Sequence, residues 1–215
     1  MHAVLLLAMA IAPDPDVAGS YPLDGVTRDI AATGPARCPN VPLVVYKGNK
    51  VRYDHPARVH PAFAERLRMF EEVVVDVARE HFGRAPVAMK HAGTYSCRRI
   101  GGYPTLISEH GIGNGIDVVG FSFPRLARKQ ATPASLPAGL RGPFQVSLAD
   151  FQAEPNTPRA RFLDALARRL IGRHDIFRVL LGPAYPGHKG HFHFDVAPYR
   201  VVSIWTSNDD GPPAP

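Results

Sequence analysis

The strongest constraint in this sequence is a strictly alternating segment near its C-terminal end, His191-Phe192-His193-Phe194-Asp195. Successive side chains of a β-strand point to opposite faces, so the histidines and the aspartate share one face and the phenylalanines share the other. Two adjacent phenylalanines on one face require a hydrophobic core to cover them. The segment therefore predicts a half-buried strand whose polar face, with two imidazoles, is a natural edge for a metal site.

Hydrophobic periodicity elsewhere predicts two main helices. Apolar residues recur at helical spacing between Phe63 and Val77, with Pro61 suited to the first turn and Gly83 to the stop, so the first helix spans about 61–82. A second helix is predicted at about 158–172. Strands are predicted at 41–46, 87–95, 116–123, 144–148, 177–181 and 191–197. This pattern favours an α+β domain with a mostly antiparallel sheet.

The chain of 215 residues suits one domain with its own core. The apolar run 1–12 is too short to span a bilayer and is typical of a signal peptide with a small-residue cleavage site, which predicts a periplasmic or secreted protein without a transmembrane span. No Lys or Arg precedes the run, so a different translation start and a merely frayed apolar terminus are the alternatives. We expect a linker at 13–35, the domain at 36–205 and a disordered polar tail at 206–215.

The formal net charge of +6 favours an anionic partner, such as peptidoglycan or another acidic cell-wall polymer. The densest basic group lies between Arg159 and Arg173 along the second helix, where a solvated helix face is the simplest interpretation. The scattered charge and the lack of a known motif argue against a nucleic-acid binder.

The two cysteines, Cys38 and Cys97, predict one disulfide if the chain is exported. Two unrelated buried thiols are the alternative. The sequence does not indicate an oligomeric state.

A second polar motif, Ser108-Glu109-His110-Gly111-Ile112-Gly113-Asn114-Gly115-Ile116-Asp117, contains a histidine and an aspartate seven residues apart. On one straight strand they would face opposite sides, but the glycines allow the tight turns that can point both side chains inward. Zinc accepts nitrogen and oxygen donors in a tetrahedron, and two histidines with one aspartate leave a position open, as in catalytic sites. A fortuitous cluster of metal-binding residues is the alternative.

Five ordered motifs extend this pattern across about 36–200. They are Thr94-Tyr95-Ser96-Cys97-Arg98, Ser108-Glu109-His110-x-x-Gly113-Asn114-x-x-Asp117, Gly120-Phe121, Val179-Leu180-Leu181-Gly182-Pro183 and His188-x-x-His191-Phe192-His193-x-Asp195. This series resembles the extensin-like C-terminal domain of bacterial envelope proteins. That family is in turn similar to zinc peptidases of the lysostaphin, D-alanyl-D-alanine carboxypeptidase and hedgehog group, and most of all to the penicillin-insensitive murein endopeptidase.

The resemblance implies a hedgehog-like or D-Ala-D-Ala-peptidase-like fold and a role for each site residue. His110, Asp117 and His193 match the zinc ligands, while His191 and His188 match histidines that assist catalysis. Arg98 or Arg99 matches an arginine that binds a substrate carboxylate or oxyanion. From the residues themselves, Asp195 and Ser108 are expected to orient the ligands without binding zinc, although a plain structural salt bridge is an equal interpretation of Asp195.

The expected function is that of a zinc-dependent peptidoglycan peptidase, either an endopeptidase or a carboxypeptidase. No Glu lies between 188 and 195, so His191 or His188 is expected to be the general base or a group that stabilises the tetrahedral intermediate. The alternative is a non-catalytic, zinc-containing domain that binds peptidoglycan or another envelope polymer.

Overall fold

The computed structural model describes residues 21–128, 132–134, 136–153 and 156–205. Its elements in chain order are β1 (Val44–Tyr46), β2 (Arg52–Tyr53), β3 (Ala57–Val59), α1 (Pro61–Phe82), β4 (Ala88–Gly93), β5 (Arg99–Ile100), β6 (Tyr103–Ile107), η1 (Glu109–Ile112), β7 (Gly115–Phe123), η2 (Ala138–Leu140), β8 (Phe144–Ser147), α2 (Ala149–Ala153), α3 (Pro158–Ile171), β9 (Val179–Leu181), β10 (Phe192–Asp195) and β11 (Val201–Ser203). The α+β class predicted from the sequence is confirmed.

The first main helix, α1, follows directly from local sequence signals. His60 caps its N-terminus by accepting a hydrogen bond from the backbone N–H of Ala62. Pro61 occupies the first turn, where a backbone N–H would have no partner within the helix, so its absence costs nothing. Gly83 ends the helix in the left-handed region at φ 68°, which glycine adopts without a side-chain clash. The predicted span of 61–82 is therefore confirmed.

The second main helix, α3, starts behind a Thr157 cap and ends at Ile171, so the predicted span of 158–172 agrees to within one residue. Phe162 of α3 contacts Phe82 of α1 and Phe121 of β7, and Phe70 of α1 contacts Phe194 of β10. Both helices thus bury their apolar faces in one core against the sheet. None of the described helices combines the length and the apolar character that a bilayer crossing requires.

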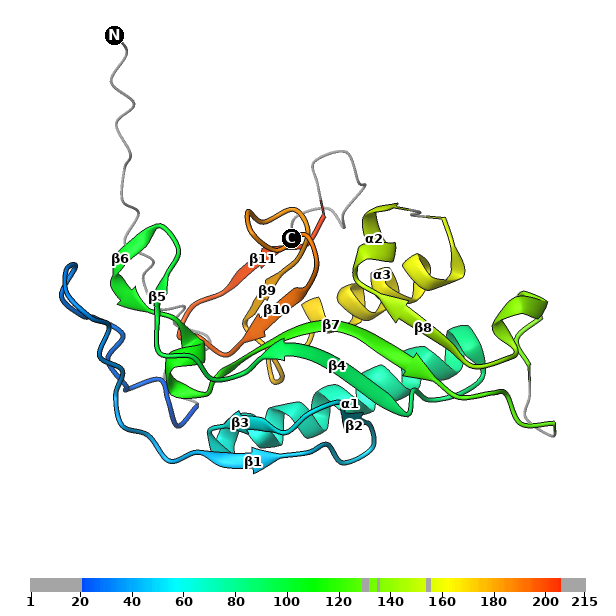
Figure 1. Cartoon of the computed structure of the whole chain (residues 1–215), viewed down its shortest axis with the longest axis horizontal. Helices are drawn as coiled ribbons and strands as arrows, with labels where there is room; N and C mark the ends of the chain where they lie inside the picture. Colours follow the sequence, from blue (N-terminus) through cyan, green and yellow to red (C-terminus); the bar gives the residue numbers. More distant parts are fainter. Residues whose placement is uncertain (1–20, 129–131, 135, 154–155, 206–215) are drawn as a thin grey trace, which may run out of the picture.

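The main sheet has the strand order β11-β9-β10-β7-β4-β2, with β8 paired to β7. Its pairs are antiparallel except β11 with β9 and β2 with β4, so the expectation of a mostly antiparallel sheet is confirmed. Figure 1 shows the long strand β7 running through the middle of the molecule, with the β5–β6 hairpin at one end of it. This position lets β7 contribute to both the core and the candidate site.

Each of the six predicted strands contains an observed strand, although β1, β4, β9 and β10 are shorter than expected. The sequence analysis missed β2, β3, β5, β6 and β11, which are two to five residues long. Such short segments do not show enough alternation to stand out, and their pairing depends on partners elsewhere in the chain.

Part of the segment expected to be a linker differs from that expectation. Tyr21 and Leu23 are buried in the main core, and Asp29 forms a β-bridge with Leu106. Residues 21–30 thus pack against the domain, although their sequence has no regular periodicity. The predicted signal peptide 1–12, residues 13–20 of the expected linker and the expected tail 206–215 lie outside the described residues.

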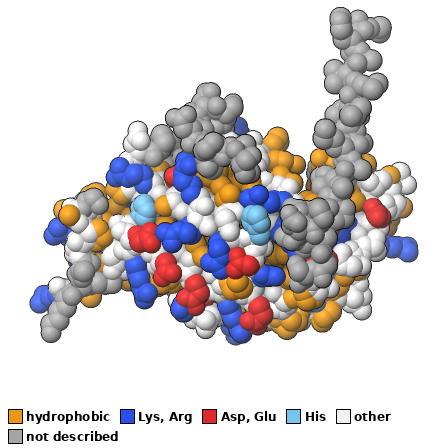
Figure 2. Space-filling model, turned by 180° about the vertical axis from the view of Figure 1, so that it is seen from behind, with side chains coloured by type: hydrophobic (Ala, Val, Ile, Leu, Met, Phe, Trp, Pro, Cys, Tyr) orange, Lys and Arg blue, Asp and Glu red, His pale blue; other side chains and the backbone are white. Residues whose placement is uncertain are grey.

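Two of the four arginines of helix α3 form ion pairs with carboxylates. Arg168 binds Asp164 on the next turn of the helix, and Arg169 binds Glu80 of α1. Figure 2, which shows the molecule from behind, has blue and red side chains interspersed over this face. This arrangement supports the interpretation of a solvated, mixed-charge helix face.

Candidate metal centre

The first histidine of the candidate centre lies on a tight 3₁₀ turn, η1. Ser108 precedes the turn and caps it, because its hydroxyl accepts a hydrogen bond from the backbone N–H of His110. Gly113 ends the turn at φ 64°, and a Cβ there would lie 2.5 Å from Leu43 and 2.9 Å from the His60 backbone nitrogen. Only glycine fits this position, and the turn directs the buried His110 ring towards β7 and β10.

The other two candidate ligands are cross-strand partners on neighbouring strands. In the antiparallel pairing of β7 with β10, Asp117 lies opposite His193. Opposite residues share a face of the sheet, which places both side chains beside the His110 ring. On the other face, Ile116 and Phe194 are also partners and fill the core.

The three side chains converge closely. His110 Nε2 lies 3.2 Å from Asp117 Oδ1 and 3.1 Å from His193 Nδ1, and His193 Nδ1 lies 2.9 Å from Asp117 Oδ1. Zinc at about 2.0–2.1 Å from nitrogen and oxygen donors in a tetrahedron separates neighbouring donors by about 3.3–3.4 Å. The three donor atoms therefore fit three corners of a zinc tetrahedron with only small adjustments.

Asp195 selects which nitrogen of His193 can bind a metal. Its Oδ2 lies 2.8 Å from His193 Nε2, and its Oδ1 accepts a hydrogen bond from the backbone N–H of Ala197. A carboxylate in this position holds the ring with a hydrogen on Nε2 and leaves Nδ1 available as a ligand. Asp195 thus contacts a candidate ligand on the side away from the centre.

The electrostatics of the cluster favour a cation at its centre. Burial alone lowers the pKa of His193, but the carboxylates of Asp117 and Asp195 outweigh burial and raise the pKa to about 9. Burial alone raises the pKa of Asp117, but hydrogen bonds with His110 and His193 outweigh it and hold the pKa well below its usual range. The negative field that favours a proton on His193 Nδ1 would equally favour a metal cation beside it.

Two further histidines stand at the mouth of the centre. His191 Nε2 lies 3.7 Å from Asp117 Oδ1, and the rings of His188 and His191 are 4.7 Å apart. Partial burial lowers the pKa of both rings, which keeps them neutral at pH 7. His188 Nδ1 lies 3.0 Å from the Pro186 carbonyl oxygen, which can only accept, so the ring hydrogen is on Nδ1 and Nε2 is free to take a proton.

The structure separates the two arginines that the sequence left as alternatives. Arg98 is exposed and lines the same groove as Asp117, His188 and His191, close enough to lower the pKa of His191. The Arg99 guanidinium instead donates to the carbonyl oxygens of Ala31 and Thr33 in the N-terminal segment and of Pro104 in β6. Arg98 is therefore the one placed to meet a ligand of the groove.

A buried network behind η1 was missed by the sequence analysis. The Arg28 guanidinium makes two parallel hydrogen bonds, of 2.8 and 3.0 Å, to the carboxylate of Glu109, the residue before His110. Asn114 also donates to Glu109 and accepts from the hydroxyl of Tyr21. The N-terminal segment thus holds the ligand-bearing turn from behind, but no local sequence pattern links Arg28 with a residue 81 positions away.

The predicted disulfide between Cys38 and Cys97 is confirmed and lies against the same turn. A Cβ on Gly111 would come within 2.6 Å of Cys38 Sγ, so the bridge packs directly on η1. The Ser96 backbone N–H donates to the His110 carbonyl oxygen, which ties the residue before Cys97 to the histidine. The disulfide therefore braces both the turn and the neighbouring Arg98.

A second group of possible ligands consists of Asp54, His55 and His91. The His55 and His91 rings stack at 3.8 Å, and His91 Nε2 is hydrogen-bonded to the His55 carbonyl oxygen. Stacked rings direct their nitrogens in parallel, not towards a common point. The group at His110, Asp117 and His193 is the better metal centre because its donor atoms converge and are mostly buried.

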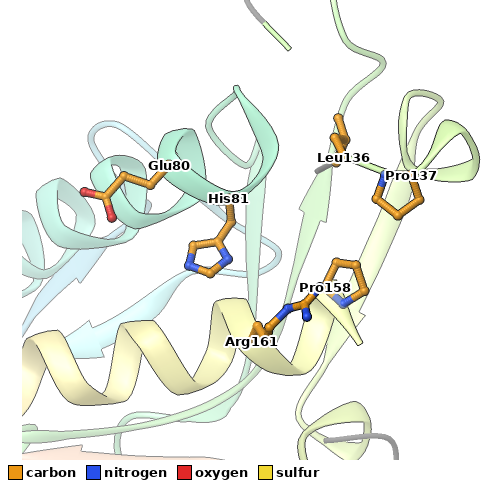
Figure 3. Close-up of a pocket in the computed structure, with 6 residues that line it drawn as sticks. All are labelled: Glu80, His81, Leu136, Pro137, Pro158 and Arg161. Atoms are coloured by element: carbon orange, nitrogen blue, oxygen red, sulfur yellow. The ribbon is translucent and has the colours of Figure 1, made fainter. Parts of the chain in front are cut away.

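A separate hollow of about 310 Å³ lies between the end of α1 and the start of α3. Figure 3 shows His81 and Arg161 on neighbouring helices beside it. Among the described residues that line it, the one carboxylate, that of Glu80, is bound to Arg169. The hollow contains none of the candidate metal ligands.

Fold and geometry together define an α+β domain with a candidate two-histidine, one-aspartate metal centre in a groove. A family model described as "Extensin-like protein C-terminus" matches residues 25–133, which include His110 and Asp117 and end before His188. The chain belongs to this extensin-like family. Comparison with curated proteins and with solved structures finds no match.

Proposed function

We propose that the protein is a zinc-dependent peptidase that hydrolyses peptide bonds in the stems or cross-links of peptidoglycan. The likeness to the lysostaphin, D-alanyl-D-alanine carboxypeptidase and hedgehog group of zinc peptidases is part of this proposal. The observation that carries it is the convergence of His110, Asp117 and His193 within 3.2 Å of one another beside two neutral histidines.

Zinc, when bound, supplies Lewis-acid chemistry, which acidifies water and polarises an amide carbonyl. The chain's own groups supply proton transfer: a neutral His188 or His191 accepts a proton from the attacking water and returns it to the leaving amine. The ordered Nδ1–H of His188 makes its Nε2 a defined acceptor. His191 is nearer to Asp117 and therefore to the candidate centre.

Arg98 supplies positive charge on the groove side of the centre. A guanidinium there can bind a substrate carboxylate through two parallel hydrogen bonds or stabilise the oxyanion that forms during amide hydrolysis. Stem peptides of peptidoglycan have free carboxylates, and the net charge of +6 favours such an anionic polymer.

Export to the periplasm or the cell exterior completes the proposal. The Cys38–Cys97 disulfide supports it, because such bonds persist in oxidising compartments and are rare in the cytosol. An exported domain would meet the cell wall directly.

Purified peptidoglycan provides the test. We expect the zinc-loaded protein to release muropeptide products that mass spectrometry can identify, and His193→Ala to lose both zinc and hydrolysis. His188→Ala and His191→Ala should keep zinc, and at least one of them should lose most hydrolysis. A zinc-loaded protein that sediments with the wall but releases no product would establish the alternative, a non-catalytic envelope-binding domain.

A further inference from the structure

The face of the sheet that carries the candidate ligands continues into a row of apolar side chains. Across β7, β10 and β9, Asp117 pairs with His193 and His193 pairs with Leu181. Two residues further along β10, Asp195 pairs with Val179, which in turn pairs with Val201 of β11. Paired residues share a face, so each row runs from the metal centre into aliphatic side chains.

These aliphatic residues form a small cluster of their own, separate from the main core. Val179 and Leu181 lie on the groove side of β9, whereas Leu180 between them belongs to the main core. Tyr185, Tyr199 and Val201 pack against the cluster and are only partly buried. The face of an antiparallel sheet away from the core is commonly polar, whereas binding pockets are lined mainly by apolar side chains, as this cluster is where it lines the groove.

The cluster forms the floor of the groove that also contains the metal centre. This groove has a volume of about 420 Å³, and the β5–β6 hairpin lines it with Ile100, Tyr103 and Leu106. Figure 1 shows the hairpin and strands β9–β11 on the same side of β7. The groove therefore has a polar end at the histidines and Arg98 and an apolar end between the hairpin and β9.

No free carboxylate among the described lining residues faces the apolar end. The three acidic residues of the lining are Glu109, Asp117 and Asp195. Glu109 is paired with Arg28, Asp195 binds His193 and a backbone N–H, and Asp117 belongs to the metal centre. A basic side chain entering the apolar end would lose its hydration without gaining a partner.

We infer that the apolar end is a specificity subsite for an uncharged aliphatic side chain of a peptide held at the metal centre. The inference rests on the proposed peptidase function, which it deepens. Neighbouring strands lie about 4.8 Å apart, so Leu181, opposite His193, is roughly 5 Å from it, while Val201, two strands across and two residues along, is roughly 12 Å away. An extended peptide rises about 3.3–3.6 Å per residue, so the subsite holds a residue one to three positions from the reacting bond.

A peptide series tests the subsite directly. The probes are acetyl-capped D-alanine tetrapeptides with a free carboxylate, in which each of the first three residues is replaced in turn by D-leucine, D-asparagine or D-lysine. Leucine and asparagine have nearly the same shape, so their difference reports apolar burial, while lysine reports charge. Affinity for the full-length, zinc-loaded protein is measured in the cold directly after mixing, and products are analysed by mass spectrometry after longer incubation.

At one of the three positions we expect leucine to bind at least about tenfold more tightly than asparagine or lysine, because burying its side chain removes apolar surface from water. Tyr103→Ala should reduce this ratio about threefold or more. Tyr95→Ala is the matched control, because Tyr95 is similarly exposed but does not line the groove. Val201→Glu should lower the ratio of leucine-peptide to lysine-peptide affinity at least about tenfold, because it supplies a carboxylate for the lysine.

The outcomes separate the subsite from the peptidase. Equal affinity for leucine and asparagine at all three positions, ratios unchanged in both Tyr103→Ala and Val201→Glu, or no measurable binding of any peptide would overturn the subsite. A leucine preference without hydrolysis would retain the subsite and overturn the peptidase. Hydrolysis without a leucine preference would retain the peptidase and overturn the subsite.

Discussion

Replacing Asp195 by asparagine tests whether the candidate centre depends on the group behind His193. The substitution preserves size but replaces a carboxylate whose oxygens lie 2.8 Å from His193 Nε2 and 2.9 Å from the Ala197 backbone nitrogen. An amide can still accept one of these hydrogen bonds, but it removes the negative charge that holds the Nε2–H form of the ring. We therefore expect weaker zinc binding without loss of the fold.

The expected size of this effect follows from how such supporting groups act on metal ligands. Removing one weakens metal affinity by about 10–100-fold, or about 1.4–2.7 kcal/mol. The stabilisation that zinc gives to the folded protein at a fixed excess concentration falls by the same amount. For a domain of this size each kcal/mol corresponds to about 2–4 °C, so the zinc-induced rise in Tm should shrink by roughly 3–11 °C.

The assay compares metal-free and zinc-loaded forms of each variant by competition with a chelating dye and by thermal unfolding. The matched control is Asp175→Asn, an exposed carboxylate paired with Arg173 away from the groove. The control should keep the unmodified zinc affinity. If the zinc affinity of Asp195→Asn is within about twofold of that of the unmodified protein, Asp195 does not determine which nitrogen of His193 carries the hydrogen, and the reasoning fails.

Three further predictions concern the ligands and the contacts behind the turn. His110→Ala should leave well under one zinc per chain by elemental analysis, and full retention of the metal would refute its place in the centre. The double variant Cys38→Ser/Cys97→Ser should lose about 4 kcal/mol of unfolding free energy in urea, from a loop of 59 residues in the chain-entropy model, and should also bind zinc more weakly. Arg28→Ala should destabilise the protein by about 3–5 kcal/mol, because it leaves the buried Glu109 without its cationic partner. The same change at the exposed Arg173 should alter the unfolding free energy by less than about 1 kcal/mol, and equal losses in the two variants would contradict the assignment.

Much of the local structure was predictable because local signals and packing agree. The span of α1 could be predicted because its proline, its final glycine and its apolar spacing all indicate the same helix. The alternation in 191–195 identified a strand with phenylalanines in the core and polar groups on the other face, as β10 shows. The cysteine count predicted a disulfide that the structure contains. The helix and the strand depend on residues that are neighbours in the chain, and two cysteines allow only one pairing.

The tertiary structure decided which of these faces meet. Alternation tells which side of a strand is polar, but only the register of β7 against β10 brings Asp117 opposite His193. Residues 21–30 have no periodicity, so the pairing of Arg28 with Glu109 became visible only when the chain was folded. The parallel pairing of β11 with β9 likewise joins Val201 to Val179 and builds the apolar end of the groove. The sequence by itself determined the types of element and the chemical character of each face. Their neighbours depend on the packing of distant segments around one core, which no local pattern encodes.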